Sequence, residues 1–211
     1  MNIYIDIETL PAGDPLDPMT LTPPGNISKK DTLDAWYQDK APLIAEEKYR
    51  ARALNSMEGV IFCLGYALGN LEQTKPTQIL FGDEKAILGQ LEAVIFDDAR
   101  FAGSLTWVGW NILTFDIPWI WRKAIQHGFD NLRKVVPHNN RILCSDLMKI
   151  WAADFKDYTK MSAVAAYLGI PHSSIEGGEV YDLWKAGDTE SIYKHCREDI
   201  DTVVNIHRRI G

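Results

Sequence analysis

The sequence lacks the features that mark secreted and membrane-embedded proteins. Its three cysteines, Cys63, Cys144 and Cys196, are widely spaced, so they predict neither a disulfide framework nor a cysteine metal site. No apolar run approaches the roughly 20 residues of a membrane span, and we expect no signal peptide before Asp6. These absences favour a cytoplasmic protein without a membrane segment, in which each cysteine is a small buried hydrophobe.

An excess of positive charge is also absent. The formal net charge of −7 argues against a general nucleic-acid-coating protein, because such proteins are usually basic. It leaves room for an enzyme that meets phosphates through bound metal ions. A hydrophobic content of 46% and a charged content of 24% are typical of globular proteins. The length of 211 residues predicts a single domain, 1–211, with room for an insertion.

The N-terminal stretch alternates apolar and polar residues with the period of a β-strand. Ile3, Ile5 and Ile7 occupy one register, and Asp6 and Glu8 occupy the other. Side chains two residues apart project from the same face of a strand, so the two carboxylates point the same way. Either they lie on a solvent-facing strand edge, or a divalent cation such as Mg²⁺ or Mn²⁺ lies between them.

Hydrophobic periodicity predicts alternating strands and helices in the rest of the chain. The predicted strands cover residues 60–68, 77–81, 105–110 and 141–144. The predicted helices cover residues 84–99 and 112–127 and much of the chain from residue 162 onward. This order indicates an α/β fold with a mixed β-sheet flanked by helices and a helical C-terminal part.

Residues 12–58 interrupt the alternation, and we expect them to form a loop and helical insertion. The prolines and glycines of residues 12–34 predict a loop. Residues 31–55 are expected to be helical, with Asp31 as a candidate cap and Pro42 dividing two helices. The basic residues of this stretch form either a solvated helix face or a mobile flap that follows a phosphate backbone.

Three further polar sites carry chemistry or capping. Asn111 can cap the helix predicted after it, and Asp116 suits the positive end of that helix dipole. His195 and Asp199 are four residues apart on the last helix and share a face, as either an incidental surface contact or a catalytic pair. Asp146 is expected to cap the next helix.

Taken in order, these sites resemble the DEDD superfamily of 3′–5′ exonucleases. The motifs are Asp-Ile-Glu-Thr at residues 6–9, Asn-x-x-x-Phe-Asp at residues 111–116, and the pair His195 and Asp199. The sequence of residues 161–170, 177–178 and 193–200 is similar to the proofreading exonuclease domains of family B DNA polymerases and their stand-alone relatives. The resemblance covers most of the chain except residues 12–58.

This resemblance implies a ribonuclease H-like fold and a metal-dependent 3′–5′ exonuclease. Such an enzyme hydrolyses phosphodiester bonds and releases nucleoside monophosphates from the 3′ end of single-stranded nucleic acid, here DNA rather than RNA, in DNA repair or replication. The resemblance implies two divalent ions, Mg²⁺ or Mn²⁺, with Asp6 bridging both. The implied metal ligands are Asp6, Glu8, Asp116 and Asp199.

The resemblance also implies substrate contacts. The backbone of Thr9 and Leu10 is expected to face the terminal nucleotide, with Leu10 as a wedge against its base. Asn111 and Phe115 are expected to line the path of the strand that enters the site.

His195 departs from the superfamily pattern. Three residues separate it from Asp199, which is the spacing of the subgroup that has Tyr in this position, whereas the side chain is typical of the His subgroup. Two roles remain open for it, accepting a proton from the attacking water or orienting that water. Two other functions also remain open, an oligoribonuclease-type phosphodiesterase and a catalytically silent nucleic-acid-binding module.

Overall fold

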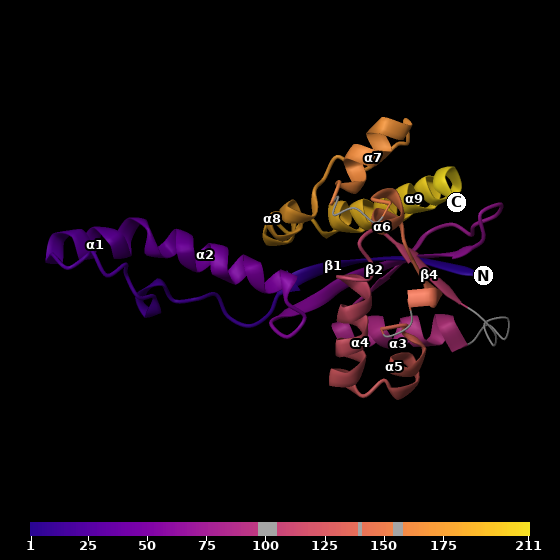
Figure 1. Ribbon diagram of the computed structural model, residues 1–211. Coiled ribbons are helices and arrows are strands. Elements are labelled where there is room, and N and C mark those ends of the chain that lie inside the picture. Colours follow the sequence, from indigo (N-terminus) through magenta and orange to yellow (C-terminus); the bar gives the residue numbers. More distant parts are fainter. Residues whose placement is uncertain (97–104, 139–140, 154–157) are drawn as a thin grey trace. The chain divides into compact units, whose positions relative to one another are not determined.

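Figure 1 shows the computed structural model, which describes residues 1–96, 105–138, 141–153 and 158–211. The chain divides into two compact units. Unit 1 contains Met1–Glu8 and Ile61–Gly211, and unit 2 contains Thr9–Val60.

The secondary structure alternates strands and helices after an opening strand and a helical stretch. The strands are β1 (Asn2–Pro11), β2 (Gly59–Gly69), β3 (Gln78–Phe81), β4 (Thr106–Gly109) and β5 (Cys144–Asp146). The first helices are α1 (Lys30–Asp39), α2 (Ala41–Ala51), α3 (Glu84–Phe96), α4 (Asp116–His127) and α5 (Asp130–Val135). The later helices are α6 (Leu147–Trp151), α7 (Met161–Leu168), α8 (Val180–Lys185) and α9 (Thr189–Ile210). Short 3₁₀ helices are η1 (Pro18–Thr20), η2 (Arg52–Leu54), η4 (Arg141–Leu143) and η5 (Gly177–Glu179).

The strands of the described residues form one five-stranded sheet in the order β3-β2-β1-β4-β5. The pairs β1–β4 and β4–β5 are parallel, and the pair β2–β3 is antiparallel. The predicted α/β fold with a mixed sheet flanked by helices is therefore confirmed. None of the described helices combines the length and apolar character that a membrane crossing requires.

Successive residues of β1 contribute their side chains alternately to the two faces of the sheet. Ile3, Ile5 and Ile7 are buried in one hydrophobic cluster together with residues of α3, α4 and α5. Tyr4 is buried in a second cluster with residues of α6, α7 and α9. These two groups of helices lie on opposite faces of the sheet in unit 1 (Figure 1). Asp6 and Glu8 have the same parity as Tyr4, so they belong to the face that α9 covers.

Helix α9 lies close to the sheet at Gly65 of β2. A Cβ atom at Gly65 would lie 2.9 Å from the Cys196 Sγ, 2.9 Å from the Ile200 Cγ1 and 3.3 Å from the Cys196 carbonyl oxygen. Only a residue without a side chain leaves room for the helix at this distance. The Cys196 thiol, whose sulfur is 3.9 Å from the Asp6 carbonyl oxygen, makes a further contact to β1.

Two further side-chain contacts join α9 to β1 and to the residue before β3. The Tyr4 hydroxyl lies 3.1 Å from Nδ1 of His207. The Thr77 hydroxyl donates to Oδ1 of Asp201 over 2.6 Å. Asp201 is two residues after Asp199 and therefore lies on a different side of the helix, where it contacts Thr77.

Two predicted boundaries differ from the structure by more than one residue, and a third falls outside the described residues. Helix α4 begins at Asp116 rather than at residue 112, because Asn111 adopts a left-handed conformation (φ 59°) and a turn follows it. Residues 141–143 form a 3₁₀ helix, and the strand predicted at 141–144 is β5, which begins at Cys144. The predicted helix at 84–99 is observed as α3 to Phe96, and residues 97–99 lie outside the described residues.

In unit 2, the loop after β1 is hydrogen-bonded to residues of the helical segment that follows it. Helices α1 and α2 meet at Lys40, and Pro42 lies in the first turn of α2, as the sequence predicts. Asp31 lies in the first turn of α1, but Lys29 occupies the N-cap position. Arg52 donates to the backbone carbonyls of Ala12 and Asp14 at 3.1 Å each, so this basic residue holds the loop. The insertion at 12–58 and its role as a flap stay predictions.

We predict that Gly65→Ala destabilises the protein. The added methyl group collides with Cys196 and Ile200 of a helix that cannot retreat without breaking its other contacts. Overpacking of this kind costs about 1–3 kcal/mol of unfolding free energy, which urea or thermal unfolding will measure. Gly178→Ala is the matched control, since a Cβ there meets no atom within 4 Å. Equal stability of the two variants would contradict the close approach of α9.

Candidate active site

Four carboxylates from three elements converge at one end of the sheet in unit 1. Asp6 and Glu8 come from β1, Asp116 opens α4, and Asp199 lies on α9. Ligand atoms of Glu8, His195 and Asp199 all lie within 4.8 Å of one another. Oδ1 of Asp116 accepts the Ile7 backbone N–H over 3.1 Å, which places this carboxylate between Asp6 and Glu8 along the strand.

The parallel arrangement of β1, β4 and β5 explains the convergence. Carboxyl ends of parallel strands meet at one edge of a sheet, where α/β proteins commonly bind ligands. Gly109 at the end of β4 pairs with Asp146 at the end of β5. A Cβ at Gly109 would lie 2.9 Å from the Ile5 carbonyl oxygen, so a glycine is needed where β4 leaves β1. The chain then turns and reaches Asp116.

Asp146 holds this turn. Its Oδ1 accepts the Asn111 backbone N–H at 3.1 Å, and its Oδ2 accepts the Leu113 N–H at 3.2 Å. Asp146 is also the N-cap of α6 and accepts from the Lys149 N–H at 3.4 Å, as the sequence predicts. Asn111 does not cap α4, because four residues separate it from the start of the helix and Phe115 occupies the N-cap position. Its carbonyl instead accepts the Thr114 and Phe115 N–H groups of the turn.

Burial and mutual repulsion disfavour the charged forms of the four acids. Burial, followed by the charge of Asp116, raises the pKa of Asp6 well above its usual value. Burial and the charge of Asp6 do the same to the pKa of Glu8. Burial raises the pKa of Asp116 to about 7, and burial and the charge of Asp6 raise the pKa of Asp199 to about 8. A positive charge among these groups would favour their ionised forms.

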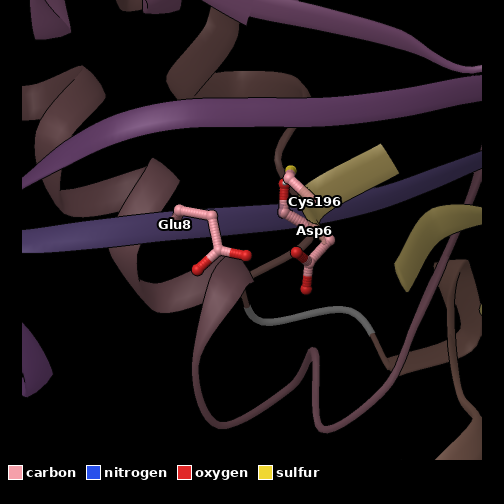
Figure 2. A group of neighbouring side chains, drawn as sticks. All are labelled: Asp6, Glu8 and Cys196. Atoms are coloured by element: carbon pink, nitrogen blue, oxygen red, sulfur yellow. Dashed lines mark hydrogen bonds between the residues drawn. The ribbon is translucent and has the colours of Figure 1, made fainter. Parts of the chain in front are cut away.

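Three of the four acids occur in two overlapping groups of possible metal ligands, and Asp116 is in neither group. One group is Asp6, Glu8 and Cys196, and the other is Glu8, His195 and Asp199. Figure 2 shows the Asp6 and Glu8 carboxylates on the same side of β1, with Cys196 next to Asp6. Hydrogen bonding with Cys63 and then burial raise the pKa of the Cys196 thiol well above its usual value, so the carboxylates are the charged donors. Carboxylate oxygens are the donors that Mg²⁺ and Mn²⁺ prefer.

His195 lies between the acids and is 3% exposed. Its Nε2 is 3.4 Å from Oε1 of Glu8, and its Nδ1 is 3.5 Å from Oδ1 of Asp199. The Nδ1 atom is also 3.0 Å from the Ser173 hydroxyl. Burial lowers the pKa of His195 below its usual value, although nearby glutamates oppose this shift. The imidazole is therefore neutral at pH 7, and its unprotonated ring nitrogen can accept a proton.

A pocket of about 490 Å³ opens beside the acids and shares His195 and Asp199 with them. Its wall combines aromatic, amide and cationic groups, among them Trp110, Asn111, Tyr158 and Lys160. Lys160 and Glu176 form an exposed ion pair of 2.6 Å in this wall.

The structure locates the predicted substrate contacts as follows. Asn111 lines the pocket. Phe115 is partly buried against the core, and the centroid of its ring lies 5.8 Å from the centroid of the Trp119 ring. Thr9 and Leu10 belong to unit 2, where the Thr9 hydroxyl donates to the Ala53 carbonyl over 2.6 Å and Leu10 is buried. Their contacts with a nucleotide stay predictions.

Sequence reasoning missed Cys196, Ser173 and the pocket residues Trp110, Tyr158 and Lys160. Cys196 directly follows His195, but a lone cysteine there carried no signal beyond burial. Ser173 lies in a loop without a recognisable pattern. These side chains meet the acids only through tertiary packing.

The fold and the buried acids define an α/β protein of the ribonuclease H-like exonuclease class. A family model described as a predicted 3′–5′ exonuclease related to the exonuclease domain of PolB matches residues 84–207. This match covers more than half of the chain, which therefore belongs to that family. Asp116, His195 and Asp199 lie within the matched residues, and Asp6 and Glu8 precede them. Comparison with curated proteins gave no match.

We predict that the metal-free protein loses stability as the pH rises from about 5 to about 8. The folded-state pKa values of Asp116 (about 7) and Asp199 (about 8) lie above the unfolded values, so the folded state binds more protons in this range. Their favourable contribution is complete below pH 4 and is lost as the pH passes through the folded-state values. Thermal unfolding in EDTA at pH 5, 6, 7 and 8 measures it.

Added Mn²⁺ is expected to raise the melting temperature more at pH 8 than at pH 6, because metal binding requires deprotonated carboxylates. The double variant Asp116→Asn and Asp199→Asn should lose the metal effect and part of the pH dependence; the rest of the pH dependence comes from Asp6 and Glu8, whose pKa values are also raised. Asp201→Asn, an exposed position on the same helix, should keep the metal effect and the full pH dependence. A metal effect that persists in the double variant would contradict this assignment.

Proposed function

We propose that the protein is a metal-dependent 3′–5′ exonuclease that releases nucleoside monophosphates from the 3′ end of single-stranded DNA. The observation that carries this proposal is the convergence of Asp6, Glu8, Asp116 and Asp199 with His195 in one buried cluster. Their order along the chain is that of the DEDD superfamily, with His195 in the position where the Tyr subgroup has tyrosine. Membership of a family related to the PolB exonuclease domain supports the reaction class and favours DNA.

The donor set fits a pair of divalent ions. Four carboxylates with raised pKa values supply oxygen donors, and no cationic side chain of the described residues lies among them to offset their negative charge when they ionise. Asp6, Glu8, Asp116 and Asp199 would hold Mg²⁺ or Mn²⁺. When bound, such ions stabilise the negative charge on the attacking and leaving oxygens of an in-line displacement.

The pocket supports a substrate that enters as a single strand. Its volume of about 490 Å³ lies within the usual range for small-ligand sites and suits one nucleotide rather than a duplex. Trp110 and Tyr158 supply aromatic surface for an unstacked base, and a phosphate would compete with Glu176 for the Lys160 ammonium group. Since the pocket shares His195 and Asp199 with the acid cluster, a nucleotide in it lies next to the reacting groups.

His195 accepts the proton of the attacking water in this proposal. Its lowered pKa keeps the imidazole neutral at pH 7, and its position between Glu8 and Asp199 places it at the pocket wall. A tyrosine hydroxyl is a poorer proton acceptor at this pH, because its neutral form holds its proton to about pH 10. Asp116, anchored by the Ile7 N–H, keeps its orientation while the other groups act.

The central experiment is digestion of a 5′-labelled single-stranded DNA with Mg²⁺, Mn²⁺ or EDTA. We expect a ladder that shortens from the 3′ end with either metal and no reaction in EDTA. An RNA strand of the same sequence and a dinucleotide should react more slowly. Preference for the ribodinucleotide would favour the oligoribonuclease-type alternative. Strand binding without cleavage would favour a silent binding module.

Replacing Asp6 or Asp199 by Ala is expected to lower kcat by about a thousandfold or more, because each removes several kcal/mol of charge stabilisation. The folded structure should persist, since each change relieves repulsion among buried carboxylates. Single-turnover digestion measures the rate, and circular dichroism checks the fold. Asp201→Ala is the control on the same helix and should digest normally. Undiminished turnover in Asp6→Ala would refute the assignment.

His195→Ala is expected to lower kcat by about 10²–10⁴-fold, the usual contribution of general acid–base catalysis. Strand binding should be retained, because the carboxylates remain in place. In the unchanged protein the rate should fall at low pH, because His195 becomes protonated there. Since burial lowers the pKa of His195, this fall should occur at a lower pH than for an ordinary histidine. The variant should lose this part of the pH–rate profile. If the variant is slower but keeps the profile, His195 only orients the water.

A further inference from the structure

We propose that Ser173 is a positioning residue, whose hydroxyl fixes the orientation of the His195 ring toward the acid cluster. This inference rests on the proposed function for its consequence in catalysis, and on geometry for the orientation itself. Ser173 is 7% exposed and His195 is 3% exposed, so water replaces neither partner easily. The distance between the Ser173 Oγ and Nδ1 of His195 is 3.0 Å.

The distances around the imidazole show which contact holds it. Hydrogen bonds from ring nitrogens to oxygen usually span about 2.7–3.2 Å. The contacts to Glu8 and Asp199 are 3.4 and 3.5 Å, beyond that range, whereas the contact to Ser173 lies within it. Neither carboxylate is therefore close enough to hold the ring by a hydrogen bond, whereas the Ser173 hydroxyl is. With Nδ1 held by Ser173, Nε2 faces Glu8 and the reaction centre.

The loop that carries Ser173 is itself tied to α9 and to its own backbone. The Thr202 hydroxyl lies 2.7 Å from the Glu198 carbonyl of its own helix and 3.2 Å from the Pro171 carbonyl of the loop, so the two carbonyls share its proton, and Thr202 is fully buried. Thr202 is seven residues after His195, so both side chains lie on the same face of α9. The Ile175 N–H donates to the Ser173 Oγ over 3.3 Å and limits rotation of the hydroxyl group. The loop thus contacts α9 at two residues, Thr202 and His195, and the second carries the proposed catalytic imidazole.

The test compares Ser173→Ala with Ser174→Ala, an exposed serine in the same loop. For Ser173→Ala we expect kcat to fall roughly tenfold, the effect of one lost hydrogen bond, with KM unchanged. Ser174→Ala should match the original protein. Ser173→Thr keeps the hydroxyl and should restore most of kcat. In a His195→Ala background, the further change Ser173→Ala should have no effect, because the ring that it positions is gone.

Two measurements do not depend on turnover. Crystal structures of the original protein and of Ser173→Ala should show a single ring orientation in the first and a rotated or split ring in the second. Calorimetric titration with Mn²⁺ should give the same affinity for both, because Ser173 is not among the acid ligands. A merely structural role would lower the melting temperature and raise KM with kcat unchanged, and that result would overturn the proposal.

The outcomes separate this proposal from the proposed function. If the original protein digests DNA and Ser173→Ala equals Ser174→Ala in kcat, the positioning role is wrong and the exonuclease stands. If the original protein digests no nucleic acid, the proposed function fails, and the ring orientation in the two crystal structures still decides the role of Ser173. An unchanged ring in Ser173→Ala would refute the positioning role under either condition.

Discussion

The site depends on the close packing of α9 against the sheet. At Gly65 the helix comes so near to β2 that even one methyl group would meet Cys196 and Ile200. The same turn of α9 carries His195, and the next turn carries Asp199. Because the distance of the helix from β2 also sets its distance from β1, a residue without a side chain on one strand determines whether Asp199 reaches Glu8 on another. The active-site geometry is thus a consequence of packing on the side of α9 that faces the core.

Packing opposes electrostatics at this end of the molecule. The four carboxylates repel one another, and burial removes the water that would solvate them, so their pKa values rise. The contacts that hold them together are apolar clusters on both faces of the sheet and specific bonds such as Ile7 N–H to Asp116. A bound divalent cation would offset this repulsion and would therefore stabilise the folded state.

Helix α9 divides its functions among its faces. His195, Asp199 and Thr202 share the face that meets the acids and the loop of Ser173. Asp201 lies elsewhere on the helix and bonds to Thr77, although it is only two residues from Asp199. Position on the helix, rather than residue type, therefore decides which aspartate joins the site. Position also decides the role of Asp146 on the sheet. It lies near Asp116, but its carboxylate oxygens accept hydrogen bonds from the backbone of the turn at Asn111 and Leu113.

The sequence by itself determined the elements and the order of the motifs. The two-residue period of β1 placed Asp6 and Glu8 on one face, and the four-residue spacing placed His195 beside Asp199, because both relations follow from local backbone geometry. Tertiary structure alone decided the start of α4 after the left-handed Asn111, the approach of α9 at Gly65, and the meeting of Ser173 and Cys196 with the site. Those features depend on contacts between residues far apart in the chain, and local periodicity contains no information about which distant residues meet.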